Sequence, residues 1–170
     1  MAIQMAALRK LIEDEGLQYF LDPHADAVLL SFDPLNGRIQ ITITIQLEGQ
    51  FLQFLSMGYA KCPPDHPHLA AVLRALAEIN SSLRLVKFAW EAKDGTIAGF
   101  ADMWLMDAPL SAKQFERMLY NFVPSLDENL PRILRTIESG VDPGPEDPEA
   151  LLARVVAETT RDQDPEVGEI

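Results

Sequence analysis

Hydrophobic and polar residues alternate without interruption along residues 38–47, RIQITITIQL. This period of two is typical of a β-strand that buries one face and exposes the other. Strand-like stretches precede and follow it, and the pair Asn36-Gly37 favours a two-residue hairpin turn between the first two. The pattern therefore predicts a three-stranded antiparallel meander at residues 26–32, 38–47 and 50–57.

The expected turns decide which residues face each other in the meander. A two-residue turn at Asn36-Gly37 pairs Phe32 with Ile41 and places the branched aliphatic side chains on one face. Continuing the register through the next turn sets Phe54 opposite Ile43 on that same face. We expect this face to form the core.

A second hairpin is predicted later in the chain. Strand-like stretches at residues 83–92 and 96–106 flank Asp94-Gly95, a pair that favours a type I′ turn. This turn places Lys87 opposite Asp102, where a cross-strand ion pair is expected. The two strands bring the predicted antiparallel sheet to five strands.

Apolar side chains recur at helical spacing in three stretches. The first is residues 1–15, the second begins near Leu69, and the third begins at Ser111, which forms a capping box with Gln114. Pro124 is expected to interrupt the third helix. The order helix, meander, helix, hairpin, helix predicts an α+β domain with its helices packed on one face of the five-stranded sheet.

Composition divides the 170 residues into a folded domain and an appendage. We assign residues 1–140 to the α+β domain, a length that suffices for one core. The stretch SGVDPGPEDP is linker-like, and we expect the extension at 141–170 to hold a short helix at 148–160 and a disordered acidic tail. The extension holds 2 Lys+Arg against 9 Asp+Glu and supplies most of the net charge of −12.

Charge and composition narrow the possible partners and compartments. The acidic balance, with no basic stripe, argues against nucleic acid, and the apolar runs are too short to span a bilayer. The N-terminus lacks the basic region and apolar block of a secretory signal. Cys62 is the only cysteine, which excludes an intramolecular disulfide and suits a reducing compartment. We expect a cytoplasmic protein that binds neither nucleic acid nor membrane.

The second face of the predicted sheet is also partly apolar. The side chains expected there are candidates for protein binding: Phe51, Leu55, Met57, Leu85, Phe100 and Trp104. Monomeric proteins rarely leave such a contiguous patch in water. The C-terminal helix, a second copy of the chain or another protein is needed to cover it. We expect the chain to form a homodimer and to bind another protein or a protein segment.

The loop at residues 61–68, KCPPDHPH, is the richest in chemically reactive side chains. Its Cys62, Asp65, His66 and His68 could supply zinc ligands, although their spacing matches no strong metal signature. A stiff helix start explains the same residues, with Pro67 at the first helical position and Asp65 or His66 as its cap. The sequence holds no nucleophile-elbow, phosphate-binding or dinucleotide-binding motif, so we expect neither enzyme activity nor a cofactor.

Over about residues 7–138 the chain resembles the YbjN family of bacterial proteins. The motifs that carry the resemblance are EIN before the fourth strand, KF within it, the Asp94-Gly95 hairpin and the leucine-serine helix start after the fifth strand. The resemblance implies an α+β sandwich similar in fold to type III secretion chaperones, no cofactor, and a chaperone-like or regulatory binding role. It transfers no catalytic residue to this chain.

These observations predict a non-enzymatic protein–protein interaction module. Two alternatives remain open, a metal-binding protein that uses the 62–68 loop and a homodimeric structural protein without a further partner.

Overall fold

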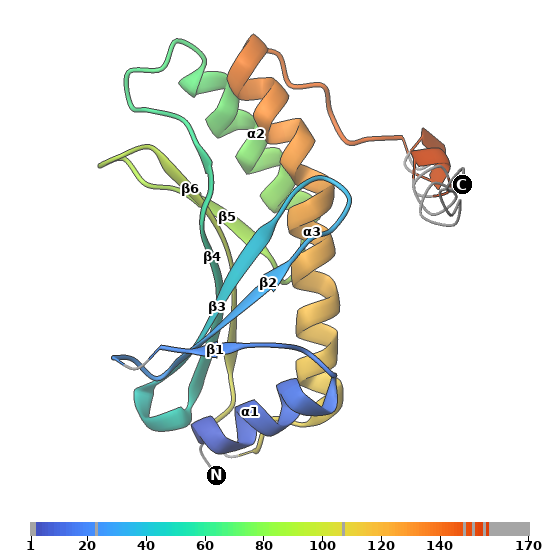
Figure 1. The fold of residues 1–170 in the computed structure, drawn as a ribbon. Helices are drawn as coiled ribbons and strands as arrows, with labels where there is room; N and C mark the ends of the chain where they lie inside the picture. The colour runs from blue at the N-terminus through green and yellow to red at the C-terminus, as the bar shows by residue number, and fades with distance from the viewer. Residues whose placement is uncertain are drawn as a thin grey trace, which may run out of the picture.

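The computed structural model describes residues 3–22, 24–106, 108–147, 149–150, 152–154 and 156. Six antiparallel strands form one sheet in the order β1-β2-β3-β4-β6-β5, and three helices pack against one of its faces (Figure 1). The strands are β1 (Phe20–Leu21), β2 (Ala27–Phe32), β3 (Ile39–Gln46), β4 (Phe51–Lys61), β5 (Lys87–Trp90) and β6 (Thr96–Trp104). The helices are α1 (Met5–Asp14), α2 (Leu69–Ser82) and α3 (Ala112–Ser139), with a short 3₁₀ turn η1 (Leu47–Gly49).

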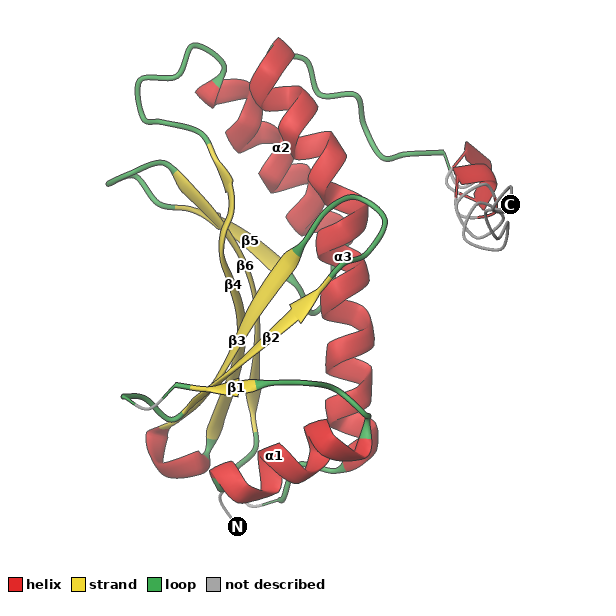
Figure 2. Cartoon of the chain, viewed as in Figure 1, coloured by secondary structure: helices red, strands yellow, loops and turns green. Residues whose placement is uncertain are grey.

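The α+β class and the helices on one face of the sheet are confirmed, but the sheet has six strands rather than five (Figure 2). The additional strand is β1, whose Phe20 and Leu21 pair with Leu29 and Val28 at the edge of the sheet. Two residues are too few to produce a detectable alternation, so the pattern of the sequence could not reveal this strand.

The first hairpin has a different register from the predicted one. Phe32 pairs with Ile39 rather than Ile41, because residues 33–38 form a longer loop than the expected two-residue turn. Asn36 in this loop is bound by α3: its backbone N–H donates to Asp127 Oδ1 at 2.7 Å. A slip of two residues preserves the faces, so the aliphatic side chains still point into the core. The predicted pairing of Ile43 with Phe54 is confirmed.

The second hairpin is also shifted by two residues. Trp90 pairs with Ile97, and four residues separate Glu91 from Thr96 in place of the predicted two-residue turn. Lys87 consequently lies opposite Phe100, and the predicted ion pair between Lys87 and Asp102 is wrong. The Lys87 ammonium instead donates to the carbonyls of Asn80 and Leu83.

Helix α3 runs for 28 residues through both Pro124 and Pro131, so the break predicted at Pro124 is wrong. The capping box of Ser111 and Gln114 is confirmed, and Gly140 ends the helix in the left-handed conformation. Burial explains the continuity: the ring of Phe54 in β4 lies 6.0 Å from that of Phe115 and 5.8 Å from that of Phe122. Packing on the sheet outweighs the local preference of proline to end a helix.

None of the helices in the described part of the chain is both long and apolar enough to cross a membrane.

Candidate protein-binding surface

The outer face is the side of the sheet that points away from the helices, and its centre is a stripe of cross-strand pairs between β4 and β6. Phe51 pairs with Trp104, with ring centroids 5.0 Å apart, and Leu55 pairs with Phe100. Between these pairs Gln53 Nε2 donates to Asp102 Oδ1 at 2.9 Å. Two apolar pairs therefore flank one satisfied polar pair.

The side chains of this stripe are accessible to a partner. Trp104 is 59% exposed, and Phe51, Leu55 and Phe100 are half-buried by their neighbours in the sheet. Met57, 63% exposed, follows the stripe in an irregular segment of β4 where the register shifts between Ser56 and Ala60. Five of the six predicted contact residues thus lie on or beside one open surface.

Leu85 is the exception among the predicted contact residues. It precedes β5, which begins at Lys87, so it does not pair with Trp104 as the predicted register required. Leu85 instead lines a groove with Arg117 and Asn121 of α3. The four-residue loop of the second hairpin shifts the register by two residues, so Leu85 is no longer opposite Trp104.

The sequence pattern missed two apolar residues of the outer face. Phe20 pairs with Leu29, and these side chains are 76% and 41% exposed. Leu29 follows the alternation of β2 and could have been recognised as outward-facing from its position between Val28 and Leu30. Phe20 carried no such signal, because its strand has only two residues.

Neighbouring positions of β3 keep the outer face low in charge. Thr42, Thr44 and Gln46 pair with Leu55, Gln53 and Phe51 in β4. These uncharged positions are less costly to desolvate than ionised groups, and the one carboxylate of the stripe, Asp102, is hydrogen-bonded to Gln53. The centre of the outer face therefore suits contact with a protein.

The described part of the C-terminal extension lies beside α3, away from the outer face (Figure 1). Arg132 of α3 is buried and binds Asp142 through two hydrogen bonds of 2.7 and 2.6 Å, and it also binds Glu78 of α2 at 3.0 Å. Further along, Arg154 donates to Asn36 Oδ1 and to Glu146. These contacts secure the extension to the helical side of the molecule.

The helix predicted at 148–160 is present at residues 149–150, 152–154 and 156. The rest of that prediction, and the predicted disordered tail, lie outside the described residues. The C-terminal helix, a second copy of the chain and another protein are the three candidates to cover the outer face. The described part of the extension does not cover it.

The loop at residues 61–68 connects β4 to α2 and contacts β5 and α3. Cys62 is buried, its carbonyl accepts from Trp90 Nε1 at 2.8 Å, and burial raises the pKa of its thiol. His66 Nδ1 accepts from the backbone N–H of His68, and His68 Nδ1 lies 2.9 Å from the carbonyl of Ile137 in α3. Asp65 is exposed.

The predicted start of α2 is wrong by two positions, since the helix begins at Leu69 with His68 at its N-cap and Pro67 outside it. Neither Asp65 nor His66 is the N-cap. His68 contacts α3 at this point, and a capping pattern formed by neighbouring residues cannot predict a contact with a distant helix. Within the described residues, no three or more His, Cys, Asp or Glu side chains are grouped so that they could hold a metal ion.

Comparisons with known proteins were made on sequence and on structure. The sequence model of the YbjN family, described as "Putative bacterial sensory transduction regulator", matches residues 5–135. No curated protein matches the chain at a significant level.

Among solved structures, YbjN from E. coli has a similar fold, with a TM-score of 0.60 at 16% identity over 80% of this chain and 92% of that chain. A chain of the ExsC-ExsE complex gives a TM-score of 0.49 at 15% identity, over 78% of this chain and 97% of its own length. A chain of the heterodimeric ExoU-SpcU complex from the type III secretion system of Pseudomonas aeruginosa gives 0.46 at 22% identity, over 74% and 93%.

Proposed function

The chain belongs to the YbjN family, and from this premise we propose that it is a protein-binding module that acts by contact rather than by catalysis. In this proposal the outer face of the sheet binds a segment of another protein. The role is regulatory or chaperone-like, and the description of the family as a sensory transduction regulator favours the regulatory form.

The observation that carries the proposal is the pair of the half-buried Phe51 and the exposed Trp104 on a sheet face without a helical layer. An antiparallel sheet commonly buries one face and presents polar residues on the other. Here the outer face presents aromatic and aliphatic side chains, and aromatic residues are enriched where proteins bind each other. Their exposure in the isolated chain is consistent with a surface that a partner buries.

A partner segment would run along β4 and β6 and contact both ends of the stripe. Phe51 and Trp104 offer one apolar contact, and Leu55 and Phe100 offer the next, with the polar pair of Gln53 and Asp102 between them. The matching chemistry is an apolar side chain at each end and a hydrogen-bonding group in the middle. Burial of this surface would supply roughly 25 cal/mol for each Å² of apolar area removed from water.

The proposal also includes a domain boundary and a cellular compartment. We place the binding domain at residues 1–140 and assign the extension a stabilising role on the helical side, as its contact with Arg132 suggests. The cytoplasm is the proposed compartment, in keeping with the single buried thiol at Cys62.

A pair of matched substitutions tests the proposal. Trp104→Glu places a charge on the outer face, and Leu73→Glu places the same charge on an exposed position of α2. Full-length forms are purified from the native host, their bound proteins are compared by quantitative mass spectrometry, and their masses are measured by light scattering. We expect the Trp104 variant alone to lose a bound protein that the unmodified chain retains.

Equal recovery of the same proteins by both variants would refute binding at the outer face. A change from dimer to monomer in the Trp104 variant, without loss of any other protein, would assign the face to a second copy of the chain instead.

A further inference from the structure

A second binding surface lies between α3 and the segment that connects α2 to β5. The described residues that line this groove are Ser82, Leu83, Arg84, Leu85, Val86, Arg117, Asn121 and Ser125. The α3 residues of this groove recur with a spacing of four, as expected for one face of a helix. The groove therefore has a helical wall on one side and an extended backbone on the other.

The groove combines apolar surface with positive charge. Val86 is buried, Leu83 is half-buried, and Leu85 is 46% exposed, so an apolar surface remains accessible. Arg84 and Arg117 are exposed, and neither guanidinium makes a hydrogen bond or ion pair within the described structure. No acidic residue is among the described residues that line the groove.

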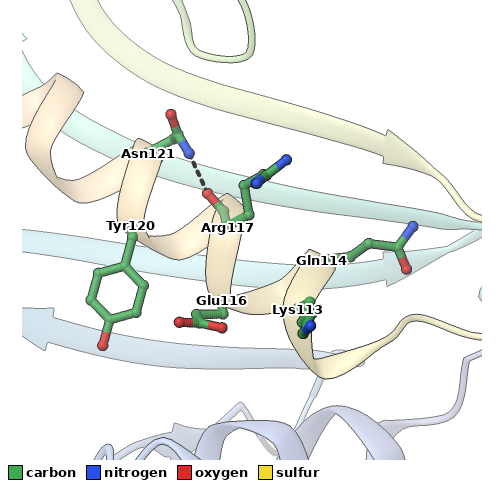
Figure 3. Close-up of a pocket in the computed structure, with 6 residues that line it drawn as sticks. All are labelled: Lys113, Gln114, Glu116, Arg117, Tyr120 and Asn121. Atoms are coloured by element: carbon green, nitrogen blue, oxygen red, sulfur yellow. Dashed lines mark hydrogen bonds between the residues drawn. The ribbon is translucent and has the colours of Figure 1, made fainter.

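An adjoining hollow lies toward the start of α3 (Figure 3). Arg117 and Asn121 also line this hollow, together with Lys113 and Glu116. Figure 3 shows Arg117 and Asn121 projecting from one side of the helix, whereas Glu116 and Tyr120 project from the other. The nearest acidic side chain of this part of α3 is therefore directed away from Arg117.

The groove brings together two arginines, Arg84 and Arg117, that have no carboxylate partner within the described residues. The protein has a net charge of −12, and several of its other arginines are paired with carboxylates: Arg9 with Glu13, Arg38 with Asp33, Arg132 with Asp142 and Arg154 with Glu146. A local positive surface on an acidic protein attracts an acidic ligand and repels basic ones.

We propose that this groove binds an acidic segment of another protein, with an apolar side chain of that segment against Leu85 and its carboxylates on Arg84 and Arg117. Arginine suits this role because its planar group can bind a carboxylate through two hydrogen bonds. The described part of the acidic extension is held elsewhere, by Arg132 and Asn36. This site is separate from the outer face and goes beyond the proposed function.

The test uses a fluorescein-labelled peptide in which leucines are spaced between glutamates, and a counterpart with lysine in place of each glutamate. Binding to the full chain is followed by fluorescence anisotropy at low and at physiological salt. The groove variant is Arg84→Glu/Arg117→Glu. The control, Arg74→Glu/Lys93→Glu, makes the same change of charge at exposed cations outside the groove.

We expect the acidic peptide to bind and the lysine peptide not to bind. The groove variant should weaken binding of the acidic peptide about tenfold or more, whereas the control weakens it less than about threefold through the general change of charge. Added salt should weaken binding to the unmodified chain, because it screens exposed charges. Leu85→Ala should also weaken binding and retain the salt dependence.

Absence of binding of the acidic peptide at low salt would overturn the proposal. Equal weakening by the groove and control variants would also overturn it, because a general charge effect would then suffice. Circular dichroism confirms that each variant is folded, and all the substituted side chains are exposed.

Discussion

Asn36 replaces a hydrogen bond that Pro131 removes from α3. In an α-helix the carbonyl of residue 127 accepts from the N–H of residue 131, and proline has none. Here the side-chain amide of Asn36 donates to that carbonyl of Asp127 at 3.0 Å, while the carboxylate of Asp127 accepts from the backbone N–H of Asn36 at 2.7 Å. The tip of the first hairpin therefore completes the helix that packs against it.

This relationship predicts a coupling between Asn36 and Pro131. Asn36→Ala should lower the free energy of unfolding by about 1–3 kcal/mol, because it leaves a part-buried carbonyl without a donor. In a Pro131→Ala background the helix regains its own N–H at that position, so the cost of Asn36→Ala should fall by about 1 kcal/mol. Urea unfolding of the four forms measures this double-mutant cycle. Strict additivity of the two substitutions would contradict the account.

Asn80 forms hydrogen bonds with the free edge of β5, and the loss of these bonds should lower stability. Asn80 Oδ1 accepts from the N–H of Phe88 at 2.8 Å, and Asn80 Nδ2 donates to the carbonyl of Phe88 at 2.9 Å. Asn80→Ala should cost about 1–3 kcal/mol of unfolding free energy and expose an edge to which other strands can pair. The control is Ser81→Ala, an exposed neighbour in α2. Similar urea midpoints for both variants would exclude the proposed protection of the edge.

The contact between Arg132 and Asp142 predicts a dependence of stability on pH. The hydrogen bonds from Arg132 hold the pKa of Asp142 below its usual range. A depressed pKa in the folded state stabilises the fold above the unfolded-state pKa, about 3.9, and this contribution is lost as pH falls through the folded-state value. Asp142→Asn should therefore cost about 1–3 kcal/mol at neutral pH and progressively less below about pH 4.

Urea unfolding of the unmodified chain and the Asp142→Asn variant at several pH values measures this difference. A gap between the two proteins that does not narrow as the pH falls through the acidic range would show that the Asp142 carboxylate does not hold the extension in place.

A side chain at position 95, in the second hairpin, should lower the free energy of unfolding. The φ of Gly95 is +76°, and a Cβ atom there would lie 2.3 Å from the carbonyl oxygen of Cys62. Gly58 has a similar φ of +68° with open space around it, so Gly58→Ala isolates the backbone strain, about 1 kcal/mol. Gly95→Ala should cost about 2–3 kcal/mol more, since the backbone must move. Equal thermal midpoints for the two variants would refute the steric explanation.

Local pattern predicted much of this fold because alternation and capping are local properties. The alternation from Ile39 to Gln46 indicates which side chains of that strand are buried, and the capping box of Ser111 with Gln114 indicates where α3 begins. Neither pattern depends on residues elsewhere in the chain. The same alternation placed Phe51, Leu55, Phe100 and Trp104 together on the outer face. A slip of two residues keeps every side chain on its face, so this prediction survived the incorrect register of the second hairpin.

The features of the fold that the sequence pattern did not predict depend on contacts between distant residues. The binding of Asn36 to Asp127 and the packing of Gly95 on Cys62 occur in the two hairpins whose registers the turn residues alone did not predict. The hydrogen bond that Pro131 removes from α3 is replaced by a donor, Asn36, that lies 95 positions earlier in the chain. The groove at Leu85 was missed because it forms only when α3 lies beside the connection to β5.

Photo-crosslinking in the native host shows whether the outer face binds another protein. Benzoylphenylalanine is incorporated in place of Trp104 and, as the control, in place of Leu73 on α2. We expect a discrete adduct with a different protein from position 104 and none from position 73. No adduct at position 104, equal yields at both positions, or an adduct only with a second copy of the chain would contradict it.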